Sequence, residues 1–442
     1  MQEPEGSPAP KPLEAAEFAA LMQPFGVSAK RVAVATSGGP DSMALALCAQ
    51  KWAWATDRRV ALLALIVDHQ LRPESADEAK EVQTRLKALG IESEILRWEH
   101  PPVTTRVHVK ARKARYDLLL DACRRHGIGE MLLAHQREDQ AETILMRIAK
   151  GSGLDGLAGM AAEAEMQGIR LLRPLLTVPK EQLVATCEAA RLATVTDPSN
   201  KASKYARGRL RRVLPLLAEE GLTVERLVDL GDRARETREA MDHTTSALLR
   251  VAVQTDKAGA VSLDLEYMRS APRAVALRAL GACLHSVHAT DYAPERALLL
   301  PLLEGLCGDD PMPARTLHGC IIGKGAKKAT LIREYASITD VVPIAPGQTV
   351  LWDGRWHVSL SPDCDLINLT VRALGTPSHD EIDRLAPGLR RAVPKGRARA
   401  ALPALWQGES LALVPDFKEK PVIAIRQSFT ICLVQPTKGN AF

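Results

Sequence analysis

The stretch AVATSGGPDSMALALC, residues 33–48, decides the fold, because a short apolar segment runs into a glycine-rich turn and then into an alanine- and leucine-rich helix. Ligands of open α/β sheets bind beyond the carboxyl ends of the strands, where such a turn lets backbone N–H groups approach an anion. The following helix directs its positive end toward the same anion. The stretch therefore predicts an anion-binding turn in a parallel sheet, with an ordinary capped strand-to-helix turn as the alternative.

The hexapeptide SGGPDS at the centre of this stretch has the chemistry of a phosphate site. Gly38 and Gly39 permit tight backbone geometry, and the hydroxyls of Ser37 and Ser42 can donate hydrogen bonds to phosphate oxygens. The Asp41 carboxylate would repel phosphate unless a cation lay between them, so the turn implies a bound magnesium ion. The turn is neither a Walker A loop, which needs a following GK[ST], nor a GxGxxG dinucleotide fingerprint.

The composition is that of a globular protein with enough chain for two or three cores: 442 residues, 46% hydrophobic and 25% charged. A formal charge of +5 is too small to indicate a polyanionic partner by itself. Eight scattered cysteines without a CxxC pair predict buried, reduced thiols. No apolar run approaches the roughly 20 residues that span a bilayer, and residues 1–12 lack signal-peptide features, so we expect a cytoplasmic protein without a membrane partner.

The chain changes character along its length. Apolar runs at 31–36, 61–67, 91–96 and 130–135 alternate with helical patterns, which predicts a parallel sheet with crossover helices. From about 220 to 305 the strands are expected to vanish, and short β-like runs follow, PVIAIR at 421–426 among them. The expected parts are a disordered tail (1–25), an α/β domain (26–217), a helical middle domain (218–305) and a small β-rich C-terminal domain (306–442).

The hexapeptide resembles the pyrophosphate-binding loop, or PP-loop, of the ATP pyrophosphatase superfamily, whose members split ATP between its α and β phosphates and activate a carbonyl oxygen as an adenylate. The resemblance implies a Rossmann-like catalytic domain over 26–217, with ATP as substrate and Mg²⁺ as cofactor. Further stretches narrow the choice within the superfamily. They are VDHQLRPES (67–75), HQREDQAET (135–143), KGSGL (150–154) and DPSN (197–200).

Together these stretches look like the tRNA(Ile)-lysidine synthetase family, strongly over about 30–217 and more weakly in the C-terminal half. The resemblance implies a ligase that forms a carbon–nitrogen bond in two steps. Cytidine O2 at the wobble position of tRNA(Ile) with a CAU anticodon attacks the α-phosphorus of ATP, and free L-lysine then displaces AMP from C2. The lysidine product reads AUA instead of AUG. Oligomeric state is left open, with a homodimer among the alternatives.

The family pattern assigns roles to residues at the ends of the predicted strands. Asp41 and Asp139 are expected to hold magnesium and to act in catalysis. Glu142 is expected to contact the lysine amine, as general base or as electrostatic anchor, against the alternative of an exposed helix carboxylate. The residues expected to bind ATP are Ser37, Gly38, Gly39, Pro40, Asp41, Ser42, Asp68, His69 and His135.

Two basic segments complete the predicted site. Arg112 and Arg115 share a helix face with Tyr116 below them, match the family's RxxRY element, and are expected near the lysine and nucleotide together with Glu138. The alternative is a solvated basic helix start. The run KASKYARGRLRR, 201–212, has six cations and no acid, which suits RNA phosphates or a solvated face. The resemblance places tRNA contacts at Asn200, Lys204, Arg207, Arg209 and Arg211. The cluster Lys324, Lys327 and Lys328 is a weaker candidate.

The sequence departs from the family pattern at four positions. The first of two paired aspartates is Glu138, a histidine is Gln136, an asparagine is Gly208 and an arginine is Lys150. We therefore favour Asp139 over Glu138 as the magnesium carboxylate. Two rival functions are a PP-loop tRNA thiolase, which usually needs a catalytic cysteine or an iron–sulfur cluster, and a non-catalytic RNA-binding protein with a degenerate ATP site.

Overall fold

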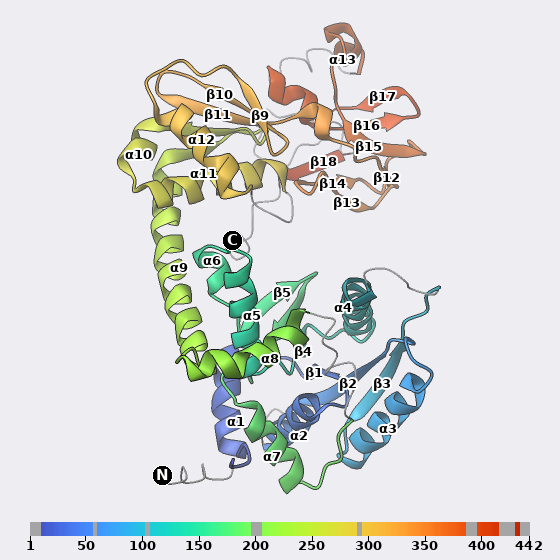
Figure 1. Ribbon diagram of the computed structural model, residues 1–442. Coiled ribbons are helices and arrows are strands. Elements are labelled where there is room, and N and C mark those ends of the chain that lie inside the picture. The colour runs from blue at the N-terminus through green and yellow to red at the C-terminus, as the bar shows by residue number, and fades with distance from the viewer. Residues whose placement is uncertain are drawn as a thin grey trace. The chain divides into compact units, whose positions relative to one another are not determined.

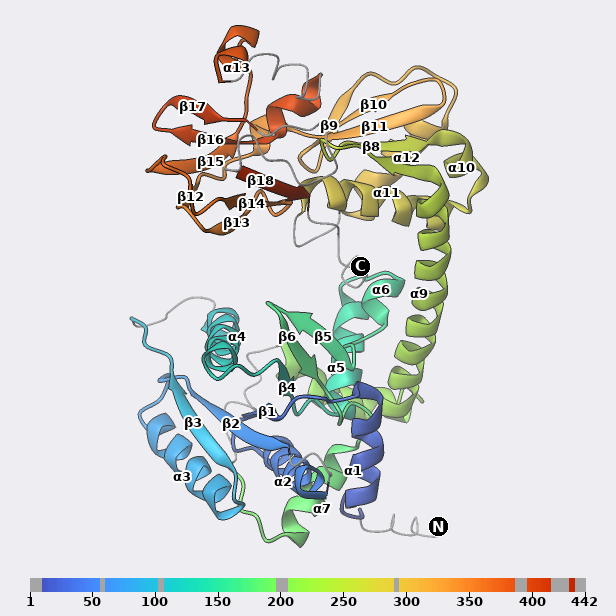
Figure 2. The ribbon, with the colours of Figure 1, turned by 180° about the vertical axis from the view of Figure 1, so that it is seen from behind.

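The computed structural model describes residues 10–55, 60–101, 107–195, 206–289, 294–385, 396–414 and 429–433 (Figures 1 and 2). The chain divides into two compact units, residues 1–238 and 239–442, and helix α9 (Val224–Ala252) passes from one to the other. The boundaries expected at 217/218 and 305/306 therefore stay predictions. None of the helices in the described ranges is both long enough and apolar enough to cross a membrane.

A six-stranded sheet forms the centre of the first unit, in the order β3-β2-β1-β4-β6-β5. All neighbours are parallel except β5, an antiparallel edge strand. The predicted parallel sheet is thus confirmed. Its strands are β1 (Arg31–Thr36), β2 (Ala61–Asp68), β3 (Glu92–Arg97), β4 (Glu130–Leu132), β5 (Glu163–Met166) and β6 (Ile169–Leu172).

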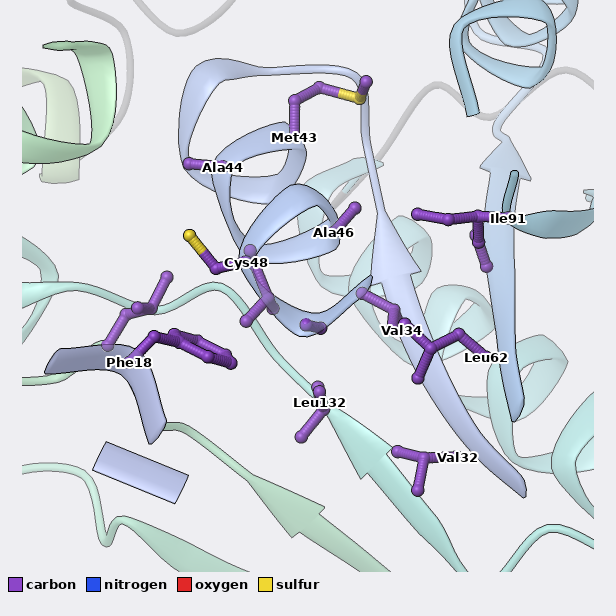
Figure 3. Close-up of a cluster of buried hydrophobic side chains, with 14 of the residues drawn as sticks. Phe18, Val32, Val34, Met43, Ala44, Ala46, Cys48, Leu62, Ile91 and Leu132 are labelled. Carbon is purple, nitrogen blue, oxygen red and sulfur yellow. The ribbon is translucent and has the colours of Figure 1, made fainter. Parts of the chain in front are cut away.

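Helices cover both faces of this sheet, because apolar residues fill both faces of each central strand. Val32 and Val34 point to the face covered by α1, α2, α3 and α7 (Figure 3). The intervening Ala33 packs with residues of α4 on the other face. The helices are α1 (Ala15–Met22), α2 (Pro40–Ala55), α3 (Ser75–Ala88), α4 (Val107–Arg125), α5 (Arg137–Ala149), α6 (Leu154–Leu157), α7 (Lys180–Ala189) and α8 (Ala206–Glu219).

The expectation of a disordered tail through residue 25 is wrong for its second half. Helix α1 lies there, followed by a 3₁₀ turn at Gln23–Phe25. Phe18 and Met22 are almost fully buried in the core of the first unit, and Phe25 is buried beside them. Phe18 and Met22 are four positions apart, so they share one apolar helical face, and burial of that face stabilises the helix. Residues 1–9 lie outside the described ranges.

The second unit begins with a mixed core rather than a purely helical one. Two short strands, β7 (Val253–Thr255) and β8 (Val261–Asp264), lie in the segment expected to lack strands. They join β9 (Arg315–Leu317), β10 (Cys320–Lys324) and β11 (Lys328–Arg333) in the antiparallel order β7-β8-β11-β10-β9. Helices α10 (Leu265–Ser270), α11 (Arg273–His288) and α12 (Arg296–Cys307) share this core.

The rest of the second unit is antiparallel β structure, which confirms the expected β-rich C-terminal region. Its sheets have the orders β12-β15-β16-β17 and β13-β14-β18. The strands are β12 (Val342–Ile344), β13 (Thr349–Trp352), β14 (Trp356–Leu360), β15 (Leu369–Ala373), β16 (Pro403–Gln407), β17 (Ser410–Leu413) and β18 (Phe429–Leu433), with helix α13 at His379–Leu385. The expected strand at 421–426 lies outside the described residues.

A buried ion cluster links the two cores of the second unit. Asp353 accepts hydrogen bonds from Arg333 and from Arg355, with Nε–Oδ2 distances of 3.0 and 2.8 Å. All three side chains are at most 7% exposed. Arg333 is the last residue of β11 in the first core, whereas Arg355 immediately precedes β14 of the second. A single carboxylate therefore compensates two guanidinium groups that have been removed from water.

We predict that Asp353→Asn lowers the free energy of unfolding by about 3–5 kcal/mol, because it leaves two buried cations uncompensated. The matched control is Glu409→Gln, which removes an exposed partner of Arg372 and should cost less than about 1 kcal/mol. Urea unfolding followed by the fluorescence of the buried Trp352 and Trp356 measures both. Equal effects of the two substitutions would show that the cluster contributes no more than a surface pair.

Candidate active site

The PP-loop joins β1 to α2, and its geometry requires glycine. Gly38 has φ +84°, and a Cβ built on it would lie 2.4 Å from Cγ2 of Val82 on α3. Its carbonyl oxygen accepts a hydrogen bond from the backbone N–H of Val195 at 2.8 Å. A side chain at this position would both strain the backbone and displace α3, so only glycine fits the turn.

The serine hydroxyls hold the loop in shape. Ser42 Oγ accepts the Ser37 backbone N–H at 3.2 Å and donates to the Gly39 carbonyl oxygen at 3.0 Å. Helix α2 starts at Pro40, a residue that is favoured in the first turn because it has no N–H to satisfy. The free N–H groups and the positive end of α2 are therefore gathered at a preformed turn, as an anion site requires.

A cavity of about 530 Å³ opens from this loop across the carboxyl ends of the strands. Residues of the loop, of the end of β2 and of α4 line it. Of the residues predicted from sequence, it is lined by Ser37, Gly39, Ser42, Asp68, His69, Arg112, Arg115, Tyr116 and His135. The other loop residues, together with Asp139, Glu138 and Glu142, are not among those lining it. Arg112 and Arg115 thus line the cavity while remaining exposed, so their place near the nucleotide and lysine stays a prediction.

Asp68 is a buried carboxylate in the cavity wall. Its Oδ1 accepts hydrogen bonds from Ser75 Oγ at 2.7 Å and from the Gln70 backbone N–H at 3.0 Å. Its Oδ2 is buried and has no hydrogen-bond partner. An ionised carboxylate only accepts hydrogen bonds, so this oxygen can receive a donor group of a bound nucleoside.

His69 and Arg115 form a second polar pair in the wall. Arg115 Nε and Nη2 lie 3.1 and 3.0 Å from His69 Nε2. A guanidinium group only donates, so His69 Nε2 must accept and the neutral imidazole carries its proton on Nδ1. The Arg112 guanidinium lies over the Tyr116 ring, 5.1 Å from its centroid.

Asp41 stands in a group of charges at the start of α2. Its pKa is raised from 3.8 to about 6, mainly by burial and also by the carboxylates of Asp139 and Glu138, while Lys180 and Arg211 act in the opposite direction. Its Oδ1 is buried without a hydrogen-bond partner. An orphaned carboxylate oxygen beside a second carboxylate suits a hard cation such as Mg²⁺. In the described part of the chain no group of three or more His, Cys, Asp or Glu side chains forms a site, so phosphate and water would have to complete the coordination.

The departure at Glu138 has a structural explanation. Its Oε2 accepts the backbone N–H of Lys180 at 2.9 Å, so the longer side chain caps the start of α7. Gln136, the other departure nearby, is the N-cap of α5 and accepts the N–H of Asp139 at 3.3 Å. In turn, the Asp139 carboxylate accepts a hydrogen bond from the backbone N–H of Gln136 at 3.3 Å. Glu138 is therefore committed to the fold, and Asp139 remains the better partner for Asp41.

Glu142 and Arg211 are paired with each other. Arg211 Nε donates to Glu142 Oε1 at 2.5 Å, and Arg211 Nη2 lies 3.7 Å from Asp139 Oδ1. The Glu142 side chain is only 2% exposed, which excludes the alternative of an exposed helix carboxylate. Arg211, predicted as a tRNA contact, thus points to the carboxylates of Glu142 and Asp139 in this structure. The spacing of the sequence alone cannot reveal that pairing.

The remaining tRNA candidates divide between surface and undescribed positions. Arg209 and the neighbouring Arg212 are exposed on α8. Asn200, Lys204 and the Arg207 side chain lie outside what the structure describes. In the second unit, Lys324 donates to the carbonyl oxygens of Gly305, Gly308 and Asp310 at 2.6–3.0 Å. Lys324 therefore binds the carboxyl end of α12, as cations there commonly do, and the suggestion that it binds tRNA is not supported.

Sequence reasoning missed Lys180 and Val195. Both lie beyond the motifs, and no short spacing connects them to the loop. The sequence gives one indication of these two residues, because each lies close in the chain to a predicted element of the site. Lys180 starts the helix after β6, and Val195 precedes the DPSN stretch. Only the folded chain brings them to Asp41 and Gly38.

Comparison with known proteins agrees with this geometry. Residues 11–217 match the family model described as "PP-loop domain", so the first unit is of the PP-loop class. The chain is 41% identical over 338 residues to tRNA(Ile)-lysidine synthase of Methylobacterium sp. (strain 4-46), which covers 74% of this chain and 97% of that protein. It is 33% identical over 393 residues to the same enzyme of Ruegeria pomeroyi, covering 87% and 88%. The chain belongs to the tRNA(Ile)-lysidine synthase family.

Among solved structures, the chain resembles the U34-tRNA thiolase NcsA from Methanococcus maripaludis with its [4Fe-4S] cluster. The TM-score is 0.43 and the identity 16%, covering 50% of this chain and 79% of that one. A likeness at this level carries no argument about function.

The raised pKa of Asp41 predicts how pH changes stability. The folded protein binds this proton more tightly than the unfolded chain does. The stabilisation of the fold by this proton is therefore complete below about pH 4 and is lost as the pH rises through 6. In metal-free buffer, Asp41→Asn should therefore raise the free energy of unfolding at pH 7.5 by up to about 3 kcal/mol, and by less at pH 5. Urea unfolding at both pH values measures this. A variant less stable than wild type at pH 7.5 would contradict it.

Proposed function

We propose that the protein joins free L-lysine to C2 of the wobble cytidine in tRNA(Ile) with a CAU anticodon, using ATP and releasing pyrophosphate and AMP. The observation that carries the proposal is a preformed anion loop with Asp41 and Asp139 behind it, in a chain that belongs to this family. ATP use follows from the PP-loop domain. We infer a cytoplasmic location because the substrates are tRNA, ATP and a free amino acid.

In the first step, cytidine O2 attacks the α-phosphorus of ATP, the bond from that phosphorus to the bridging oxygen breaks, and pyrophosphate leaves with the electron pair. The step makes a good leaving group of an amide-like oxygen. The loop amides are placed to stabilise the charge on the phosphates, while the Ser42 hydroxyl holds the loop in shape. The unpartnered Asp68 Oδ2 is placed to accept a donor from the adenosine part.

Asp41 and Asp139 are the residues that would hold Mg²⁺. When bound, the ion would neutralise phosphate charge beside these carboxylates. Burial keeps Asp41 partly protonated near pH 6, so loss of its proton at higher pH prepares it for a cation. The rate of adenylation should therefore rise between pH 5 and pH 7.

In the second step, the ε-amine of lysine attacks C2, AMP leaves, and the attacking nitrogen loses a proton. The buried Glu142 is the carboxylate suited to the amine, as base or as anchor. Its present partner is Arg211, so lysine would have to share or replace that pairing. Arg211 thereby links α8 to the lysine step.

Neither rival function is favoured by the site. A thiolase would need a reactive cysteine, and Cys187 lies against the loop with its thiol bonded to the Pro40 carbonyl oxygen at 3.4 Å. Burial raises the pKa of this thiol to about 11, which keeps it protonated and inert. A binding protein with a decayed ATP site would not need a glycine at the positive φ of Gly38 or a carboxylate as costly to bury as Asp41.

The direct test is nucleoside analysis of isoleucine tRNA after incubation with the protein, ATP and lysine. We expect lysidine to appear, and pyrophosphate to be released over repeated turnovers, only when tRNA and lysine are both present; tRNA and ATP alone should give at most one pyrophosphate per tRNA. Asp41→Asn should still bind tRNA but release no pyrophosphate, because the carboxylate that holds the cation is gone. Repeated pyrophosphate turnover without dependence on lysine would favour a thiolase, and no release at all would favour a binding protein.

For tRNA binding, we predict that Arg209→Gln combined with Arg212→Gln weakens affinity and lowers the slope of log K against log salt by roughly 2, because two phosphate contacts are lost. The matched control, Arg124→Gln with Arg125→Gln at the end of α4, removes two cations away from the basic run and should leave the slope unchanged. Filter binding at several salt concentrations measures both. Equal slopes for both double variants would show that the basic run, residues 201–212, is a solvated surface and does not bind tRNA.

A further inference from the structure

The turn from β2 to α3, residues 68–75, is closed on itself by one carboxylate. Asp68, the last residue of β2, accepts the Ser75 hydroxyl at 2.7 Å and the Gln70 backbone N–H at 3.0 Å, both at Oδ1. Ser75 is the first residue of α3, and its backbone N–H donates to the Arg72 carbonyl oxygen at 3.2 Å. The two ends of the turn are therefore joined directly by their side chains.

Both partners of the hydrogen bond between Asp68 and Ser75 are held in place by regular secondary structure. The Asp68 carbonyl oxygen accepts the Trp98 backbone N–H at 2.9 Å, which continues the parallel pairing of β2 with β3. On α3, Val82 and Leu86 are buried in the core of the first unit. The positions of the two residues are thus set by a strand and a helix, and their hydrogen bond fixes the orientation of the Asp68 carboxylate.

Gln70 supplies the second donor to the same carboxylate oxygen, and it does so from a strained backbone. Its φ of +50° lies in the left-handed region, which is unfavourable for a residue with a side chain. In this conformation its N–H donates to Asp68 Oδ1. The turn therefore directs two donors at Oδ1, although the carboxylate has a second oxygen that could have shared them.

The second oxygen of this carboxylate, Oδ2, is left for a ligand. Among the described residues it has no hydrogen-bond partner, and Asp68 is only 1% exposed. A buried acceptor without a donor is costly, and native proteins rarely leave one in that state. Asp68 and Ser75 both line the cavity that opens from the PP-loop. A donor group of a ligand in this cavity would remove that cost.

We propose that Ser75 is a positioning residue for ATP: by binding Oδ1, it leaves Asp68 Oδ2 as one fixed acceptor for a hydroxyl or amino group of the nucleoside. The inference rests on the proposed function and deepens it, since it names the part of ATP that this wall recognises. A phosphate oxygen that carries no proton cannot donate and is repelled by a carboxylate, so Asp68 acts on the nucleoside and the PP-loop on the triphosphate. The donors of adenosine are the 6-amino group of the base and the 2′- and 3′-hydroxyls of the ribose.

Loss of the Ser75 hydroxyl would leave the Asp68 carboxylate with the Gln70 N–H alone. The terminal torsion of an aspartate is broad, so the carboxylate could then turn and share its oxygens between the turn and the ligand. Binding of the nucleoside would have to order the acceptor again. Ser75→Ala should therefore weaken recognition of the nucleoside and leave recognition of the triphosphate intact.

The test is calorimetry with Mg²⁺, without tRNA or lysine, on wild type, Ser75→Ala and Ser75→Thr, the last of which keeps the hydroxyl. The ligands are ATP, inorganic tripolyphosphate and three analogues that each lack one donor: 2′-deoxy-ATP, 3′-deoxy-ATP and purine riboside triphosphate. The matched control is Ser378→Ala, which removes a hydroxyl that accepts the Glu381 N–H at 3.1 Å at the start of α13. Urea unfolding checks that each variant is folded.

We expect Ser75→Ala to bind ATP about tenfold more weakly than wild type, because an ordered hydrogen bond is lost, and to bind tripolyphosphate with unchanged affinity. Ser75→Thr and Ser378→Ala should match wild type. The analogue that lacks the donor for Oδ2 should bind wild type at least about tenfold more weakly than ATP does. In Ser75→Ala this difference should shrink to roughly threefold or less, because the two changes act on the same contact.

Wild-type ATP affinity in Ser75→Ala would overturn the inference. An equal loss of affinity for tripolyphosphate would overturn it as well, since a general disturbance of the site weakens both ligands. Equal binding of ATP and all three analogues by wild type would show that Oδ2 receives no donor from the nucleoside. Because this calorimetry uses neither tRNA nor lysine, it decides the role of Ser75 even if the protein forms no lysidine.

Discussion

The electrostatic balance around Asp41 is the constraint on which the rest of the site depends. Removing this carboxylate from water next to Asp139 is costly, and the raised pKa of about 6 expresses that cost. Lys180, Arg211 and the positive end of α2 offset part of it. What remains is an unsatisfied oxygen beside a phosphate-binding loop. Such a site gains most from a ligand that brings a cation and an anion together, as ATP with a divalent ion does.

Helix α8 would connect this balance to the proposed tRNA-binding run. Arg211 extends from α8 to Glu142 and Asp139, while Arg209 and Arg212 of the same helix are exposed. On the amino-terminal side of the basic run, Val195 bonds to the carbonyl oxygen of Gly38 in the loop. One contact to the ATP site therefore lies before the basic run, residues 201–212, and another lies near its end. If bound RNA shifts α8, Arg211 carries the shift to the carboxylates of Glu142 and Asp139. By thermodynamic linkage, ATP would then change the affinity for RNA by the same factor as RNA changes the affinity for ATP.

How much the sequence predicts depends on the range of the interaction. The parallel sheet follows from apolar runs at regular intervals, and the loop follows from six consecutive residues, because both signals are local. The cap formed by Glu138 on α7 and the pairing of Arg211 with Glu142 join residues 42 and 69 positions apart. Lys324 illustrates the same limit, since a lysine in a basic cluster cannot be distinguished by composition from one that binds the end of α12. The strands β7 and β8 were missed because three or four residues are too few to show a period.

A crystal structure with Mg²⁺ and an ATP analogue that cannot be cleaved between its α and β phosphates tests the central claim most directly. The account predicts the β and γ phosphates at the backbone N–H groups that begin α2, with the ion between them and the carboxylates of Asp41 and Asp139. A triphosphate bound elsewhere in the cavity, or an ion that touches neither carboxylate, would contradict it.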